Sequence, residues 1–280
     1  MKRALMMAAV IIAVGFTAVA AAQPAPSVDE ILDLSGVRAQ LVGLTSDLPA
    51  HLGLQPGELA PADEAAMLRI VQRGFAPDVL YPVVRERFAR HADEARMRDV
   101  AAWLRSPLGM RITRMETDVA TGAARQQAGE YAARLRHHPP PQRRLVLIQR
   151  LDAVGHGTDM SIDVVVTMTR SMGMAIERAR HGSRPGDLAE MERQLALART
   201  QMRPMLHEAS LVLYLFTYRA LSDAELERYI TFLGSDAGQW FIGASRSAML
   251  HAIGVAADAT TTEIVRAVPL ERWKGGPPTR

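Results

Sequence analysis

The sequence predicts an all-α protein, a helical bundle built from two related multi-helix halves. Apolar residues recur three and four positions apart in many segments, which is the spacing of one buried helix face. Aromatic residues make up only 5% of the chain, and alternating β-branched segments typical of strands are scarce. The same helix, corner and helix motif also occurs twice, with 129 residues between equivalent positions. We therefore expect a duplicated helical fold.

The later copy of the motif, residues 221–241, begins with a strong helix start. Ser222 is placed to cap the first turn, and the side chain of Glu225 can accept from the backbone N–H of Ser222. The following helix has one apolar face, formed by Leu226, Tyr229, Ile230 and Leu233. The equivalent face in the earlier copy is formed by Met97, Val100, Ala101 and Leu104.

A second helix follows each of these helices after a sharp corner. Ser106 and Ser235 can cap it, and Pro107 occupies its first position, where a missing N–H costs nothing. Gly109 and Gly238 lie inside it, where glycine costs about 1 kcal/mol relative to alanine, so we expect each to allow close helix approach. The residues assigned to this structural motif are Trp103, Leu104, Ser106, Pro107, Gly109, Phe232, Leu233, Ser235, Gly238 and Trp240.

The later corner has the form Phe-x-x-Ser-x-x-Gly, given by Phe232, Ser235 and Gly238, and it follows an acidic helix start. In this the chain resembles the bacterial exported proteins grouped as domain of unknown function 2059. The first half resembles them through Ser106, with Trp103 in place of the phenylalanine. The resemblance implies an exported helical protein, and no catalytic residue comes with it.

Residues 1–22 have the form of a secretory signal peptide. Lys2 and Arg3 precede an apolar run, and residues 20–22 form a small-residue cleavage site. A membrane anchor is the alternative, but the run is shorter than the ~20 residues that a spanning helix needs. The chain has no cysteine, which excludes disulfides and a lipoprotein anchor. We expect a periplasmic or secreted protein with no membrane span after cleavage.

The first helical repeat is expected to occupy residues 23–136. Its helices are expected near residues 27–46, 63–73 and 77–91, separated by stretches rich in proline and glycine. The first copy of the motif follows, and its second helix is expected to continue from 107 to about 135.

Residues 137–144 are expected to be a basic, proline-rich linker between the halves. Three consecutive prolines at 139–141 cannot continue a helix. We interpret the segment as a solvated linker. The alternatives are a basic contact with an anionic envelope surface and a metal site at His137 and His138, although adjacent histidines point apart on a helix.

The second helical repeat is expected at residues 145–258, with a turn inserted near 181–186. Its apolar run at residues 211–216 is either the central helix of this half or a dimer face. Residues 259–280 are expected to form a C-terminal tail that is partly disordered. Before the second copy of the motif, helices are expected at 188–202 and 204–220.

The charge balance and the absence of familiar motifs limit the possible functions. The formal net charge is +3, and loss of Lys2 and Arg3 would leave 31 basic and 30 acidic residues, which does not favour nucleic-acid binding. No H-E-x-x-H motif, P-loop, serine elbow or cysteine nucleophile is present. His156, His207 and His251 are isolated in the sequence. We therefore assign no catalytic, cofactor-binding or metal-binding residue.

Methionine is the unusual component of this sequence. Thioether sulfur is a good ligand for copper(I), so methionine clusters in an exported protein without cysteine are a possible copper site. Methionine also fills gaps in helical cores and provides adaptable binding surfaces. The clustered residues are Met160, Met168, Met172 and Met174, followed later by Met191, Met202 and Met205.

We expect an exported helical binding or structural module that is not an enzyme and needs no cofactor. Its partner is expected to be another envelope protein or a second copy of the chain. The alternatives are periplasmic copper handling by methionine and, third, hydrolysis of an envelope polymer.

Overall fold

The computed structural model describes residues 25–43, 59–119, 122–181, 185–269 and 272. Within these residues the regular structure is helical and no strand is present, which confirms the all-α prediction. The signal peptide expected at residues 1–22 and the last residues of the expected tail, 273–280, lie outside the described residues.

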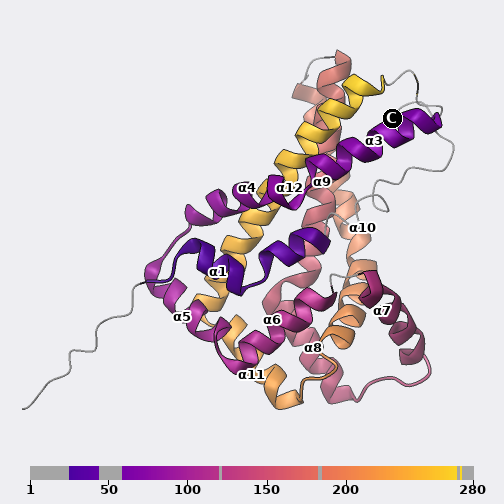
Figure 1. Cartoon of the computed structure of the whole chain (residues 1–280). Coiled ribbons are helices and arrows are strands. Elements are labelled where there is room, and N and C mark those ends of the chain that lie inside the picture. The colour runs from indigo at the N-terminus through magenta and orange to yellow at the C-terminus, as the bar shows by residue number, and fades with distance from the viewer. Residues whose placement is uncertain (1–24, 44–58, 120–121, 182–184, 270–271, 273–280) are drawn as a thin grey trace, which may run out of the picture.

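The helices divide at residue 141 into a first and a second half (Figure 1). The first half contains α1 (Val28–Leu34), α3 (Pro61–Gly74), α4 (Pro77–Ala89), α5 (Glu94–Leu104), α6 (Pro107–Val119) and α7 (Gly122–Leu135). The second half contains α8 (Gln142–Gly155), α9 (Gly157–His181), α10 (Pro185–Thr217), α11 (Asp223–Leu233) and α12 (Asp236–Ala267). A further helical stretch at 37–43 follows α1.

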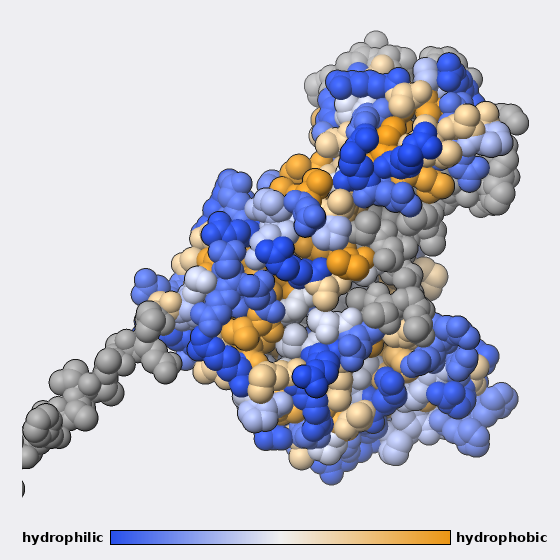
Figure 2. All heavy atoms as spheres, in the orientation of Figure 1, coloured by the Kyte–Doolittle hydropathy of each residue, from blue (hydrophilic) through white to orange (hydrophobic). Residues whose placement is uncertain are grey.

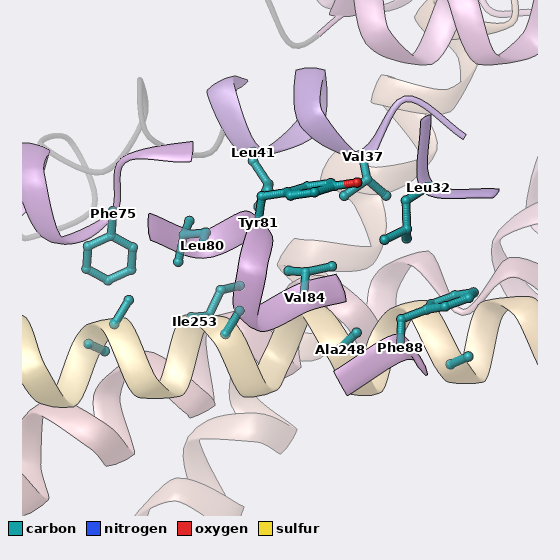
Figure 3. Close-up of a cluster of buried hydrophobic side chains, with 14 of the residues drawn as sticks. Leu32, Val37, Leu41, Phe75, Leu80, Tyr81, Val84, Phe88, Ala248 and Ile253 are labelled. Atoms are coloured by element: carbon teal, nitrogen blue, oxygen red, sulfur yellow. The ribbon is translucent and has the colours of Figure 1, made fainter. Parts of the chain in front are cut away.

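Helix α12 is the centre of the fold. It packs against α9 of its own half and against α3, α4 and α5 of the first half, so both halves share one core (Figure 1). Figure 3 shows Val84 and Phe88 of α4 against α12, beside Ala248 and Ile253. Alanine at every fourth position lets neighbouring helices approach α12 closely, at Ala244, Ala248, Ala252 and Ala256.

The segment 211–216, interpreted as the central helix of the second half or as a dimer face, is buried at Leu215 and Phe216 but not throughout. It forms the last part of α10, where Phe216 is buried and contacts the ring of Tyr131 from α7, whereas Leu213 is 42% exposed. The two helices expected at 188–202 and 204–220 are also one helix, because Pro204 lies inside α10 without ending it. Packing of α10 along α9 and α8 offsets the hydrogen bond that proline cannot donate.

The boundary expected at residue 259 is wrong, because α12 continues to Ala267. Thr260, Thr261 and Ile264 in this segment are buried. The segment looks polar in sequence, but threonine hydroxyls can bond within the helix, as Thr262 does to the carbonyl of Asp258 at 2.9 Å. The buried hydroxyl of Thr260, by contrast, has no hydrogen-bond partner in the described structure.

Three other expected boundaries differ from the structure. The helix expected from 107 to about 135 is two helices, since α6 ends at Val119 and α7 begins at Gly122. Residues 182–184 of the expected turn lie outside the described residues, and Pro185 already belongs to α10. The expected linker 137–144 is shorter, because α8 begins at Gln142.

Arg144, expected in a solvated linker, is largely buried at the start of α8. Its side chain is 13% exposed and donates to the backbone carbonyls of Tyr218 and Leu221 at 2.5 and 2.8 Å and to Asp223 at 3.0 Å. The neighbouring Arg143 is 69% exposed and pairs only with surface carboxylates. Arg144 therefore fastens α8 to the turn between α10 and α11.

Hydrophilic residues cover much of the face shown in Figure 2, with hydrophobic residues in patches between them. No helix in the described part of the chain is both long enough and apolar enough to cross a bilayer.

The start of α11 has the full capping box that the sequence predicts. The hydroxyl of Ser222 accepts from the backbone N–H of Glu225, and the Glu225 carboxylate accepts from the Ser222 N–H at 2.8 Å. Arg111 of α6 approaches the same carboxylate oxygen at 2.9 Å. These interactions, first the bond from the Ser222 backbone, lower the pKa of Glu225 to about 2.

The capping box should make stability depend on pH in the acid range. Because the folded-state pKa of Glu225 lies below its ordinary 4.5, its contribution is present above about pH 4.5 and is lost as the pH falls toward about 2. Glu225→Gln should cost up to about 1 kcal/mol at neutral pH, because it removes the charge that pairs with Arg111 and strengthens the bond from the Ser222 N–H, and almost nothing near pH 2. Urea unfolding across this range measures the difference. Glu227→Gln, on the exposed side of α11, is the control, and a pH-independent deficit for Glu225→Gln would contradict the assignment.

Candidate functional site

The two corners of the repeated motif have nearly the same local geometry. Ser106 and Ser235 each accept a hydrogen bond from the N–H of the glycine three residues later, at 3.0 and 3.1 Å. Each serine hydroxyl also donates to the carbonyl of the aromatic residue three positions before it, at 2.6 Å in both corners. The same hydrogen bonds therefore form each corner.

The structure brings the two corners together. The ring of Trp103 stacks on that of Phe232 with centroids 4.5 Å apart and 7° between the planes. Leu104 and Leu233, the next residues, are both buried. The equivalent aromatic residues of the two repeats thus contact each other, and the corners form an interface between the halves.

Trp240, another residue of the predicted motif, holds the start of α12 against the first half. Its indole N–H donates to the carbonyl of His91 at 3.0 Å, and its ring contacts that of Phe88 edge-on at 5.7 Å. Asp236, at the first position of α12, pairs with Arg96 of α5 at 2.7 Å. Pro107 occupies the corresponding first position of α6.

A cavity of about 460 Å³ opens beside the stacked rings, between the two halves. Helices α1, α4, α5 and α6 of the first half and α8 to α12 of the second half all contribute to its wall. Most of the lining side chains are apolar or aromatic, and they include Leu104, Ile112, Met160, Phe241 and Met249.

A carboxyl group faces this cavity from α6. Oε1 of Glu116 accepts hydrogen bonds from the phenol groups of Tyr218 at 2.6 Å and Tyr229 at 2.7 Å. Glu116 is half-buried and lines the cavity. Burial raises the pKa of Glu116, and the two phenol hydrogen bonds oppose that shift. Burial also raises the pKa of both phenols.

Tyr214 extends this polar group toward α9. A Cβ atom on Gly157 would lie 1.7 Å from the Tyr214 hydroxyl, so the absence of a side chain at Gly157 makes room for the ring. Burial, followed by the nearby Asp152 and Glu116, raises the pKa of Tyr214. Ser245, which also lines the cavity, has a buried hydroxyl without a hydrogen-bond partner in the described structure.

His207, which is isolated in sequence, belongs to a hydrogen-bonded group outside the cavity wall. The buried carboxylate of Asp152 accepts from the backbone N–H and the hydroxyl of Thr158, at 2.8 and 2.7 Å. Its Oδ2 also lies 3.1 Å from Nδ1 of His207. This group joins α8, α9 and α10.

Sequence reasoning did not identify Glu116 or Asp152 as site residues. Glu116 is 102 and 113 residues from the tyrosines that it binds, and no motif links them. One signal was available, since Glu116 lies four residues after Ile112 on the buried face of α6. A carboxylate on such a face needs hydrogen-bond partners.

The methionines occupy several separate places. Met191 and Met202 pack against a small core cluster of α9 and α10, whereas Met168 packs against the main core. Met160 lines the cavity, and Met205 is 63% exposed. These positions fit gap-filling in the core better than one shared thioether site.

The described residues contain no group of three or more histidine, aspartate or glutamate side chains arranged to hold a metal ion. His137 and His138 are exposed at the end of α7. No protein-family model, curated protein or solved structure matches the chain.

Proposed function

We propose that the chain is an exported, non-enzymatic binding protein and that the cavity between its two halves is the ligand site. The observation that carries the proposal is a cavity of about 460 Å³ whose mainly apolar and aromatic wall contains one carboxyl group, that of the half-buried Glu116. Ligand sites are typically ~300–1,000 Å³ in volume, mainly apolar, with few polar groups that fix orientation. Further polar residues in the same wall include Thr113, Ser161 and Ser245.

The chemistry of the wall favours binding over catalysis. A hydrolase needs a nucleophile with an adjacent base, or two carboxyl groups that flank the bond to be cleaved. Glu116 instead accepts from two phenols whose own pKa values are raised by burial. Asp152 and His207 do not line the cavity.

Export is proposed from the sequence alone. The basic start, the apolar run and the small residues at 20–22 support a signal peptide, and the resemblance of the two corners to an exported family supports the same location. A periplasmic or secreted binding protein would meet its ligand, or another envelope protein, outside the cytoplasm.

Titration with an apolar fluorescent probe, N-phenyl-1-naphthylamine, tests the site. We expect one saturable site in the wild type and none in Ser161→Phe, which places a ring in the cavity wall. Thr169→Phe is the matched control, because Thr169 lies on the same helix, makes the same bond to the carbonyl four residues earlier and is exposed. Circular dichroism checks that both variants fold. Equal binding by the two variants would contradict this site.

A further inference from the structure

The acidic charge in the cavity wall lacks a cationic partner within the protein. Glu116 is the acidic residue among those that line the cavity, and it takes part in none of the ion pairs in the described part of the chain. Its described partners, Tyr218 and Tyr229, both donate to the same oxygen, Oε1. Burial disfavours the ionised form of a carboxyl group that has no cationic partner, so a cation bound in the cavity would stabilise the carboxylate.

Aromatic residues line the cavity that this carboxyl group faces, and two of them, Tyr218 and Tyr229, donate to it. Trp103 and Tyr229 lie parallel with centroids 6.0 Å apart, and Tyr218 meets Tyr229 edge-on at 5.8 Å. The cavity is also lined by Tyr214, Phe232 and Phe241. Ring faces are electron-rich and attract cations, and an aromatic cage beside a carboxylate is a common way to recognise organic ammonium ions.

The arginine in the cavity wall, Arg246, is already paired with a carboxylate of the protein. Arg246 lines the cavity and donates through Nε to Oδ2 of Asp163 at 2.8 Å, while Arg199 binds Oδ1 of the same carboxylate at 2.6 Å. Asp163 is buried, with a side chain that is 9% exposed. An anionic ligand would have to compete with Asp163 for Arg246, whereas a cation would find Glu116 unpaired.

We propose that this cavity binds an organic ammonium ion with an apolar substituent. The cationic head would lie at the Glu116 carboxyl among the tyrosines, and the apolar part would lie along Leu104, Ile112 and Met249. This inference rests on the proposed function, because it assigns a ligand class to the same cavity. A bound cation favours the ionised carboxylate, so it reverses the effect of burial on Glu116.

Three probes with the same ten-carbon chain separate charge from hydrophobicity: decyltrimethylammonium, decanol and decyl sulfate, each kept below its micelle concentration. Calorimetric titration of the mature protein should give binding of the ammonium probe at least about tenfold tighter than decanol, with the sulfate weakest. Because decanol measures the apolar contribution alone, the ratio of the first two affinities isolates the cation.

Glu116→Gln removes the charge but keeps a carbonyl oxygen that can accept from both phenols. We expect this variant to bind decanol as the wild type does and to lose the preference for the ammonium probe. Glu208→Gln is the control, because it removes an exposed carboxylate of α10 and changes the net charge equally. Thermal melting of both variants checks the fold.

The outcomes distinguish the two proposals. If none of the probes binds the wild-type protein, the proposed function itself fails. If decanol binds as tightly as the ammonium probe, or if Glu116→Gln still prefers the ammonium probe over decanol, the cavity remains the proposed ligand site. The assignment of an ammonium ion as its ligand is then overturned. Tightest binding of the sulfate would overturn it as well and would indicate Arg246 as the recognising group.

Discussion

Gly238→Val is expected to lower the free energy of unfolding by about 3 kcal/mol, at the upper end of the range for overpacked sites. A Cβ atom at this position would lie 2.1 Å from the carbonyl oxygen of Phe232 and 2.8 Å from the Cα of Leu233. Both contacts are with backbone, which cannot rotate away as a side chain can. Gly109→Val should behave alike, since a Cβ there would lie 2.1 Å from the carbonyl oxygen of Trp103.

The variant Gly238→Ala separates two effects on stability, the steric clash of a Cβ atom and the helix propensity of alanine. Propensity alone would stabilise α12 by about 1 kcal/mol, but the same Cβ clash makes us expect a net loss. Gly243→Ala is the control in the same helix, because a Cβ there has no neighbour within 4 Å, and it should raise stability. Thermal and urea unfolding of the variants give the comparison. Unchanged midpoints for both valine variants would mean that the corners do not require glycine.

Arg144→Met is expected to cost about 2–4 kcal/mol of unfolding free energy, because charged hydrogen bonds in partly buried sites are lost. The substitution keeps the apolar stem of the side chain and removes the three donor contacts to Tyr218, Leu221 and Asp223. Two carbonyl groups of the turn after α10 then lose their guanidinium partner. Urea unfolding monitored by circular dichroism measures the loss.

Arg143→Met, one residue earlier, is the matched control. Arg143 contacts Asp223 at 3.4 Å and Glu227 at 3.2 Å from an exposed position, and exposed pairs contribute about 0–1 kcal/mol. A loss for Arg144→Met no larger than that for Arg143→Met would show that burial of the guanidinium does not matter. The difference between adjacent arginines is invisible in sequence, since both follow the same three prolines.

The fold class and the two corners could be predicted from the order of the residues, because both depend on residues a few positions apart. The capping box of Ser222 and Glu225 and the bond from the Gly238 N–H to Ser235 each span three residues. Such contacts form wherever the chain turns into a helix, so the residue types indicate them directly. The apolar stripes that define α5 and α11 are local in the same sense.

The tertiary structure decided which helix is central, where α10 and α12 end, and which polar groups meet. Helix α12 is packed on several sides, so it has no single apolar stripe, and its alanines and threonines do not mark it as a core helix in sequence. Glu116 lies in α6, Tyr218 in the turn after α10 and Tyr229 in α11, and they become neighbours only when the two halves pack. Contacts across more than 100 residues depend on the packing of whole helices, and local residue patterns carry no record of them.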